Sequence, residues 1–264
     1  MTIIIGIGSI FLLTALQAFA DPSFTGITNS DFDSITKEMS ANFAHSSNLG
    51  PSKMGIIFGV QVGLIAAQTG TPNTDAIVKR SGGSGLPNLY NAGLLGAVGI
   101  PMGIAFEAVI IPKLTASGSS LNSTSFAVKW NINEVVPVLP VNLALRGFYS
   151  NAAFEFGQTV ATIPVTVSSK TKVTGLQLLI SPMLPLVEPY LGIGLLSGTT
   201  ELGVTGAISI FDPAYSTAQS ETKTASATQM IAGIDVNLLI MKIGAEFTQS
   251  FGASRTAVKL AFGF

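Results

Sequence analysis

Apolar and polar positions alternate along most of the chain after residue 53. Near the C-terminus, Val258, Leu260 and Phe262 fall on one face, while Lys259 and Ala261 fall on the other. A period of two is typical of a β-strand, and about ten such residues suffice for a strand to cross a membrane. The same pattern recurs along the chain and predicts strands near 53–67, 88–99, 103–115, 122–133, 139–151, 171–182, 187–198, 226–239, 240–251 and 254–264.

The two faces of these segments differ in a way that favours a barrel. Nearly every strand charge lies on the face of small and polar residues, and the other face is aliphatic and aromatic. A soluble β-sandwich would also alternate, but its solvated face would carry more charge. The sequence therefore predicts an all-β fold, a closed antiparallel transmembrane β-barrel of ten strands. Twelve strands is the alternative, because 156–168 and 200–211 also look strand-like.

The connections between the predicted strands are of two kinds, which predicts an orientation. Short inner turns and long outer loops are usual in such barrels. Short links that contain proline are predicted periplasmic turns, at 100–102, 133–140 and 181–189. Longer polar stretches are predicted outer loops, at 68–87, 116–121, 152–170 and 199–225. Both termini are then expected on the periplasmic side.

The N-terminus carries the features of an export signal. An uncharged apolar run covers residues 3–16, and Ala18-Phe19-Ala20 precedes Asp21, which matches an A-x-A cleavage site. The run is short for a membrane-spanning helix, which needs about 20 residues. The sequence predicts a signal peptide at 1–20, an N-terminal segment at 21–52 and a barrel at 53–264.

One segment before the barrel has helical instead of alternating periodicity. Phe32, Ile35, Met39 and Phe43 recur at the spacing of one helix face. The pattern predicts an amphipathic helix at 31–45.

Ser30 or Asp31 is the expected N-cap of this helix. The helix could plug the lumen against inward apolar residues such as Ile57 and Leu239, lie on the membrane surface, or bind a partner.

Composition and charge exclude several classes of protein. The chain has 264 residues, of which 47% are hydrophobic and 10% charged, with no cysteine and a net charge of −1. The apolar content excludes disorder, and the missing cysteines exclude a disulfide scaffold. The charge balance argues against a nucleic-acid partner. No metal-ligand cluster or cofactor motif is visible, so neither a metal nor a cofactor is expected.

The charged residues predicted to face the lumen are of both signs. They are Glu107, Lys113, Lys129, Arg146, Glu188, Asp235, Lys242, Glu246, Arg255 and Lys259. In one interpretation they pair and fill a narrow barrel, because unpaired charges in a dry interior are costly. In the other they line a pore with a slight preference for anions.

Catalysis by a hydroxyl nucleophile needs a base within hydrogen-bond reach. The only histidine is His45, which lies in the segment before the first predicted strand and away from any predicted lipid-facing serine. The run His45-Ser46-Ser47 is interpreted as a polar helix exit on the periplasmic side, and the protein is not expected to be an enzyme.

Two stretches carry a family resemblance. The ending 258–264 (VKLAFGF) resembles the last strand of Gram-negative outer-membrane barrels, whose C-terminal Phe is read by the barrel assembly machinery. The stretch 186–194 (LVEPYLGIG) resembles a strand opening common in small outer-membrane proteins. The predicted helix loosely resembles the N-terminal plug of fatty-acid-transport-type barrels. The resemblance implies residence in the outer membrane, lipid and assembly-machinery partners, and an assembly role for Phe264.

The sequence leaves two functions open. A narrow porin-like or hydrophobic-solute channel agrees with the lumen charges and the N-terminal helix. A structural or surface-interaction barrel agrees with the long outer loops. A lipid-modifying barrel enzyme is the weakest of the readings, and the identity of any solute is open.

Overall fold

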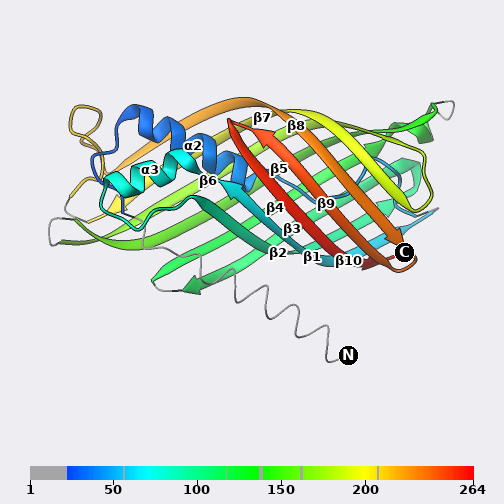
Figure 1. The fold of residues 1–264 in the computed structure, drawn as a ribbon, viewed down its shortest axis with the longest axis horizontal. Coiled ribbons are helices and arrows are strands. Elements are labelled where there is room, and N and C mark those ends of the chain that lie inside the picture. Colours follow the sequence, from blue (N-terminus) through cyan, green and yellow to red (C-terminus); the bar gives the residue numbers. More distant parts are fainter. Residues whose placement is uncertain (1–22, 56, 117, 137–138, 161–162, 207) are drawn as a thin grey trace.

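The computed structural model describes residues 23–264, except 56, 117, 137–138, 161–162 and 207. The predicted signal peptide at 1–20 lies outside the described residues. The fold is a closed antiparallel barrel of ten strands (Figure 1). The strands are β1 (Gly59–Gly70), β2 (Asn88–Ile100), β3 (Ile104–Ala116), β4 (Ser119–Asn131), β5 (Val141–Val160), β6 (Ile163–Pro182), β7 (Val187–Thr205), β8 (Ser220–Leu238), β9 (Met241–Ser250) and β10 (Ala253–Gly263).

Each strand pairs with its neighbours in sequence, and β1 pairs with β10 to close the sheet. The prediction of a ten-stranded barrel is confirmed. The additional strand-like stretch 156–168 forms the far ends of β5 and β6, and 200–205 forms the far end of β7. These stretches lengthen existing strands and do not add new ones.

Side chains alternate between the two faces of the wall as the sequence predicts. On β7, Leu191, Ile193 and Leu195 are 62–66% exposed and point outward. Tyr190 and Leu196, on the opposite face of the same strand, are buried in the interior. The outward face is apolar along part of every strand, whereas polar and charged residues such as Lys170, Lys172 and Glu201 occupy it further along β6 and β7. The apolar part of the outside is suited to lipid, and the mixed interior is not.

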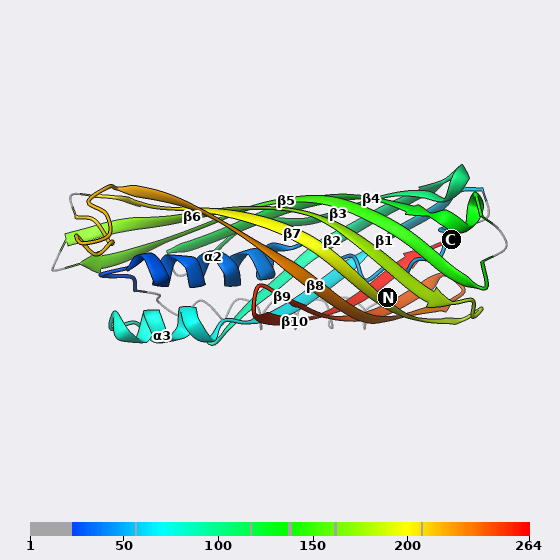
Figure 2. The ribbon, with the colours of Figure 1, turned by 90° about the horizontal axis from the view of Figure 1, so that it is seen from above.

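The two ends of the barrel differ in their connections. At one end, here called the Phe264 end, the links are short and include the single helical turns η1 (Pro101–Gly103) and η2 (Ile132–Glu134). At the opposite end, here called the α3 end, helix α3 (Pro72–Arg80) joins β1 to β2. Strands β5 to β8 have 19 or 20 residues and extend past the others at the α3 end (Figure 2).

The sequence predicts both termini on the same side of the membrane, but the first and last described residues lie at opposite ends of the barrel. Ile27 forms a bridge with Phe211 in the β7–β8 connection, and the Phe24 amide donates to Gln158 on β5, both at the α3 end. The Val60 amide donates to the Phe264 carbonyl at the opposite end. Between these points the N-terminal segment runs through the barrel.

Helix α2 (Asn29–Phe43) lies against the inner face of the β5–β8 extension, and α3 covers it from the other side (Figure 2). The largest cluster of buried apolar side chains lies here and joins the two helices to the barrel wall. None of the described helices is both long enough and apolar enough to cross a membrane.

Candidate functional site

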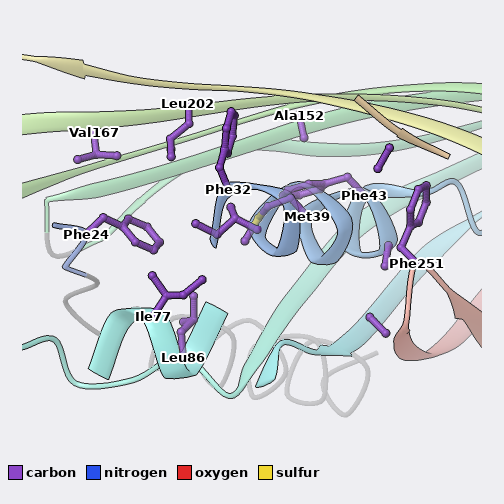
Figure 3. Close-up of a cluster of buried hydrophobic side chains, with 14 of the residues drawn as sticks. Phe24, Phe32, Met39, Phe43, Ile77, Leu86, Ala152, Val167, Leu202 and Phe251 are labelled. Atoms are coloured by element: carbon purple, nitrogen blue, oxygen red, sulfur yellow. The ribbon is translucent and has the colours of Figure 1, made fainter. Parts of the chain in front are cut away.

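Helix α2 occupies the interior of the barrel at the α3 end through its apolar face. Phe32 and Ile35 are 0% and 1% exposed, and Met39 and Phe43 are also buried. Figure 3 shows Phe32 and Met39 between the wall and α3, with Val167 and Leu202 on the wall side and Ile77 and Leu86 on the other. The four apolar residues of the predicted helix face therefore all lie within the barrel.

The limits and the wall contacts of this helix differ from those predicted. The N-cap is Thr28, whose hydroxyl accepts from the Asp31 amide while the Asp31 carboxylate accepts from the Thr28 amide. Ile57 and Leu239 do not contact the helix, because they lie at the Phe264 end and are 63% and 91% exposed. Ile57 precedes β1, and Leu239 is in the β8–β9 turn, so strand alternation does not determine where either side chain points.

Part of the polar face of α2 is buried too, because α3 covers it. The Glu38 carboxylate accepts hydrogen bonds from the backbone amides of Asn73 and Thr74 and from both of their side chains, at 2.6–2.9 Å. These amides are in the first turn of α3, where backbone donors lack helical partners. The α3 N-cap, Thr71, makes no side-chain cap of its own, so Glu38 supplies the cap from another helix.

Beyond α2, residues 44–52 run through the lumen toward the Phe264 end. Nε2 of His45 lies 3.1 Å from a Glu107 oxygen, and Nδ1 lies 2.9 Å from the Ser125 hydroxyl. A carboxylate can only accept, so Nε2 carries the proton, and in the neutral ring Nδ1 accepts from Ser125. Ser47 donates to the same Glu107 oxygen at 2.7 Å. The first half of this segment is thus hydrogen-bonded to β3 and β4.

Arg146 on β5 connects the segment to two acidic residues. Its Nη1 donates to the Ser47 hydroxyl at 3.0 Å, and its charged nitrogens lie 3.5 Å from Glu107 and 3.9 Å from Glu246. Glu246 accepts from Ser46 and from the Tyr190 hydroxyl. The guanidinium is 0% exposed, so the arginine charge is held inside the barrel by the two carboxylates and the segment together.

A second group of contacts holds residues 50–52. The Glu188 carboxylate accepts from the Ser52 amide and hydroxyl, and from Ser181. Lys129 donates to the carbonyls of Gly50 and Ser52. The segment is therefore anchored along its length by charged side chains of the wall.

Eight of the ten charged residues predicted to line the lumen are at most 9% exposed and lie in the interior. They are Glu107, Lys129, Arg146, Glu188, Asp235, Glu246, Arg255 and Lys259. Lys259 pairs with Asp235 at 2.9 Å, and Arg255 donates to the Ala44 carbonyl.

The other two predicted lumen residues lie elsewhere. Lys242 is on the inward face of β9 but only half-buried, near the Phe264 end. Lys113 is exposed, because the β3–β4 register shifts between Ile111 and Leu114 and changes which side chains face inward. The strands of the wall therefore carry four buried bases and four buried acids, which removes the excess of bases behind the expected preference for anions.

Burying this many charges is costly unless each is paired and hydrogen-bonded. Most of these charged groups have such partners, but some of their individual oxygen and nitrogen atoms have none. Among the described residues, one oxygen each of Glu107 and Asp235, and one nitrogen each of Arg146 and Arg255, have no hydrogen-bond partner. The interior at this level is a polar wall around a polar segment, and not a packed apolar core.

His45-Ser46-Ser47 lie inside the lumen, with each residue at most 3% exposed, so the interpretation as a polar helix exit on the periplasmic side is wrong. The lumen role of residues 44–52, the capping by Glu38 and the helix α3 were not predicted. None of these has a periodicity signal, because each depends on contacts with residues far away in sequence. Within the described ranges, no group of acidic or histidine side chains is arranged to hold a metal ion.

Comparison with known proteins gives distant structural matches. The chain resembles Neisserial surface protein A (10% identity, TM-score 0.34), with 78% of this chain and 95% of that chain covered. It resembles the outer membrane protease OmpT from Escherichia coli (11% identity, TM-score 0.42), with 78% of this chain and 96% of that chain covered. It also resembles the translocator domain of autotransporter NalP from Neisseria meningitidis (9% identity, TM-score 0.46), with 87% of this chain and 92% of that chain covered. No curated protein matches the chain.

A family model matches residues 10–264, which is nearly the whole chain. The chain therefore belongs to the family of unknown function DUF6588.

Proposed function

We propose that the protein is a narrow outer-membrane channel that its own N-terminal segment, residues 23–52, closes in the resting state. The apolar outer surface and the closed, fully paired sheet support residence in a bilayer, since a closed barrel leaves no unpaired strand edge in lipid. The two longest connections, which join β1 to β2 and β7 to β8, both lie at the α3 end, and they support an orientation with the Phe264 end facing the periplasm.

The observation that carries the proposal is the chemistry of the wall behind residues 44–52. Arg146, Lys129, Glu107 and Glu188 contact the segment directly, and each is buried. A barrel that served only as a scaffold would gain as much stability from apolar side chains of similar volume. A charged wall would instead hydrogen-bond water and a polar solute when these take the place of the segment.

The proposed channel is narrow and passes small polar solutes of either sign. A barrel of about ten strands leaves little space once its side chains are placed. The four buried acids balance the four buried bases. The same walls that hold the segment would then provide hydrogen-bond partners along the solute path.

The test is single-channel conductance of the refolded full chain in a planar bilayer. Ser46→Asp places a carboxylate beside Glu246, to which Ser46 donates at 2.7 Å, and should drive the segment from the wall. We expect rare openings in the wild type and frequent openings in this variant. Ser84→Asp, at an exposed serine of the β1–β2 connection, is the matched control and should behave as the wild type. Equal conductance in all three folded proteins would contradict the proposal.

A second function is favoured by the extension of β5–β8 past the other strands at the α3 end. In the proposed orientation this extension projects outward from the membrane and could bind other surfaces. Removing the far ends of β5 and β6, next to Val160 and Ile163, would then abolish adhesion of cells that carry the protein while leaving its conductance unchanged. A shortened protein that keeps both adhesion and conductance would argue against this second function.

A further inference from the structure

The connections at the Phe264 end all present large apolar side chains to the outside. These side chains are 39–91% exposed and occur in every one of the five links at this end. They are Ile57 and Phe58 before β1, Met102 between β2 and β3, Val135 and Val136 between β4 and β5, Met183, Leu184 and Leu186 between β6 and β7, and Leu239 and Ile240 between β8 and β9. Phe264 itself is 77% exposed. We call this set the apolar rim.

The described residues of the opposite end form no such rim. In the described parts of the α3-end connections, large apolar residues such as Ile77, Ile210 and Phe211 are buried. The links of the Phe264 end carry two charged residues within their described parts, Lys53 and Glu134, which pair with each other at 2.8 Å. The charges of the links therefore compensate each other within an apolar rim, and contiguous exposed apolar patches mark contact with a membrane or a partner.

The apolar rim continues the apolar outer face of the strands without a break. On β7, Leu186 is followed by the outward-facing Val187 and then by Leu191 and Leu195. The eight residue steps from Val187 to Leu195 rise about 26 Å along the strand, or about 20 Å along the barrel axis at a tilt of about 40°. The apolar band of such barrels is about 25 Å tall, so the outward apolar stretch of β7 alone does not span it.

The backbone of the rim suits a medium poor in water. Backbone donors in lipid need internal partners. In the rim the amides of Val135 and Val136 donate to Ile132, and the amide of Leu184 donates to the Pro182 carbonyl. Further donors are removed by proline at Pro101, Pro140, Pro182 and Pro185.

From these observations we propose that the apolar rim is immersed in the acyl–headgroup boundary of the phospholipid leaflet at the Phe264 end, so that the turns contact lipid and do not project into the periplasm. This inference rests on the proposed residence in a bilayer and is independent of channel activity. It assigns the rim a lipid partner, with the short strands extended by their turns to match the membrane thickness.

The test uses single-tryptophan variants in vesicles of phospholipid brominated near the headgroup end of the acyl chain. In a Trp130→Phe background, tryptophan is placed at Leu239 or at Leu184, in two different turns. Leu195→Trp on the outward face of β7 is the control for lipid contact, and Ser84→Trp in the β1–β2 connection at the α3 end is the control for water. Bromine quenches only a tryptophan that contacts the acyl chains.

We expect the two rim tryptophans to lose fluorescence as Leu195→Trp does, and to resist quenching by aqueous iodide. Ser84→Trp should show the reverse. Rim tryptophans that iodide quenches and brominated lipid does not would overturn the inference while leaving bilayer residence intact. If Leu195→Trp were not quenched by brominated lipid either, bilayer residence itself would be wrong. The channel proposal is tested separately, by the conductance of the Ser46→Asp variant, so its failure can be told from the failure of the rim inference or of bilayer residence.

Discussion

The carboxylate of Glu38 lies 2.8 Å from the backbone nitrogen of Thr74 and 2.6 Å from the Thr74 hydroxyl. The pair joins the helix inside the barrel to the helix of the first long connection. At the other end of α3, Arg80 donates to Asp31 at 2.6 Å. Helix α2 is thus held at two points by a segment that faces the outside in the proposed orientation.

Replacement of Glu38 by glutamine should loosen α3 from α2. An amide in place of the carboxylate loses charge-assisted hydrogen bonds to buried donors, and we expect a loss of about 2 kcal/mol in the free energy of unfolding. The rate of hydrogen exchange at the Asn73 and Thr74 amides should rise in the same variant. Asp33→Asn removes an ion pair with Lys37 on the exposed side of the same helix and should cost less than about 0.5 kcal/mol. Equal effects of the two variants would contradict the capping role of Glu38.

The contact between Asp31 and Arg80 should resist mild acid. Burial alone would raise the pKa of Asp31, but hydrogen bonds from Arg80 and Thr28 hold that pKa below its ordinary value. A carboxyl with a lowered pKa stabilises the folded state above the ordinary aspartate pKa of about 3.9, and this stability is lost as the pH falls through the lowered value.

Protease sensitivity of the α3 connection should therefore stay low down to about pH 4 and rise below it. Asp31→Asn should remove this pH dependence and raise the sensitivity at neutral pH. A transition near neutral pH that survives in Asp31→Asn would show that another group controls the contact.

Arg146 should be the most sensitive charged residue of the interior. Its removal by Arg146→Met leaves Glu107 and Glu246 buried with less compensation, and we expect a loss of about 3–5 kcal/mol. Combining it with Glu107→Leu should cost less than the sum of the two single changes, because the second change removes an uncompensated charge. Chemical unfolding of the refolded barrels measures all three, and simple additivity would mean that the pair is not coupled.

Gly50 lies where no side chain fits beside Glu188. A Cβ at this position would meet the Glu188 carboxylate, which Ser52 and Ser181 hold in place. Gly50→Ala should therefore destabilise the closed barrel by about 1–3 kcal/mol. Gly96→Ala on β2 is the matched control, because a Cβ there would meet nothing within 4 Å. A Gly50→Ala protein as stable as the Gly96→Ala control would mean that the segment can shift along the lumen without cost.

The barrel could be predicted from sequence because strand alternation is a local signal. Each outward residue such as Val258 or Leu260 identifies the face of its neighbours, and ten such segments give the strand number. The signal fails where the alternation breaks. Lys113 follows Pro112 at the register shift and turns outward, and Leu239 leaves the strand at a turn.

The interior arrangement could be predicted only in part. The spacing of Phe32 and Ile35 predicts a helix with one apolar face, and the structure shows that face within the barrel. The path of residues 44–52 depends on hydrogen bonds such as that of Ser47 with Glu107, which are 60 residues apart in sequence. Helix α3 is short and its apolar residues are few, so its sequence is typical of a polar loop. The assembly role of Phe264 stays a prediction.

The closed state is tested most directly by a single cysteine at Ser47, which is 0% exposed in the lumen. The chain has no other cysteine, so a charged thiol reagent reports on this position alone. In the refolded full chain we expect almost no labelling from either side of the bilayer, and fast labelling once Ser46→Asp is added. Fast labelling of Ser47→Cys without Ser46→Asp, together with a steady conductance, would contradict closure of the lumen by the N-terminal segment.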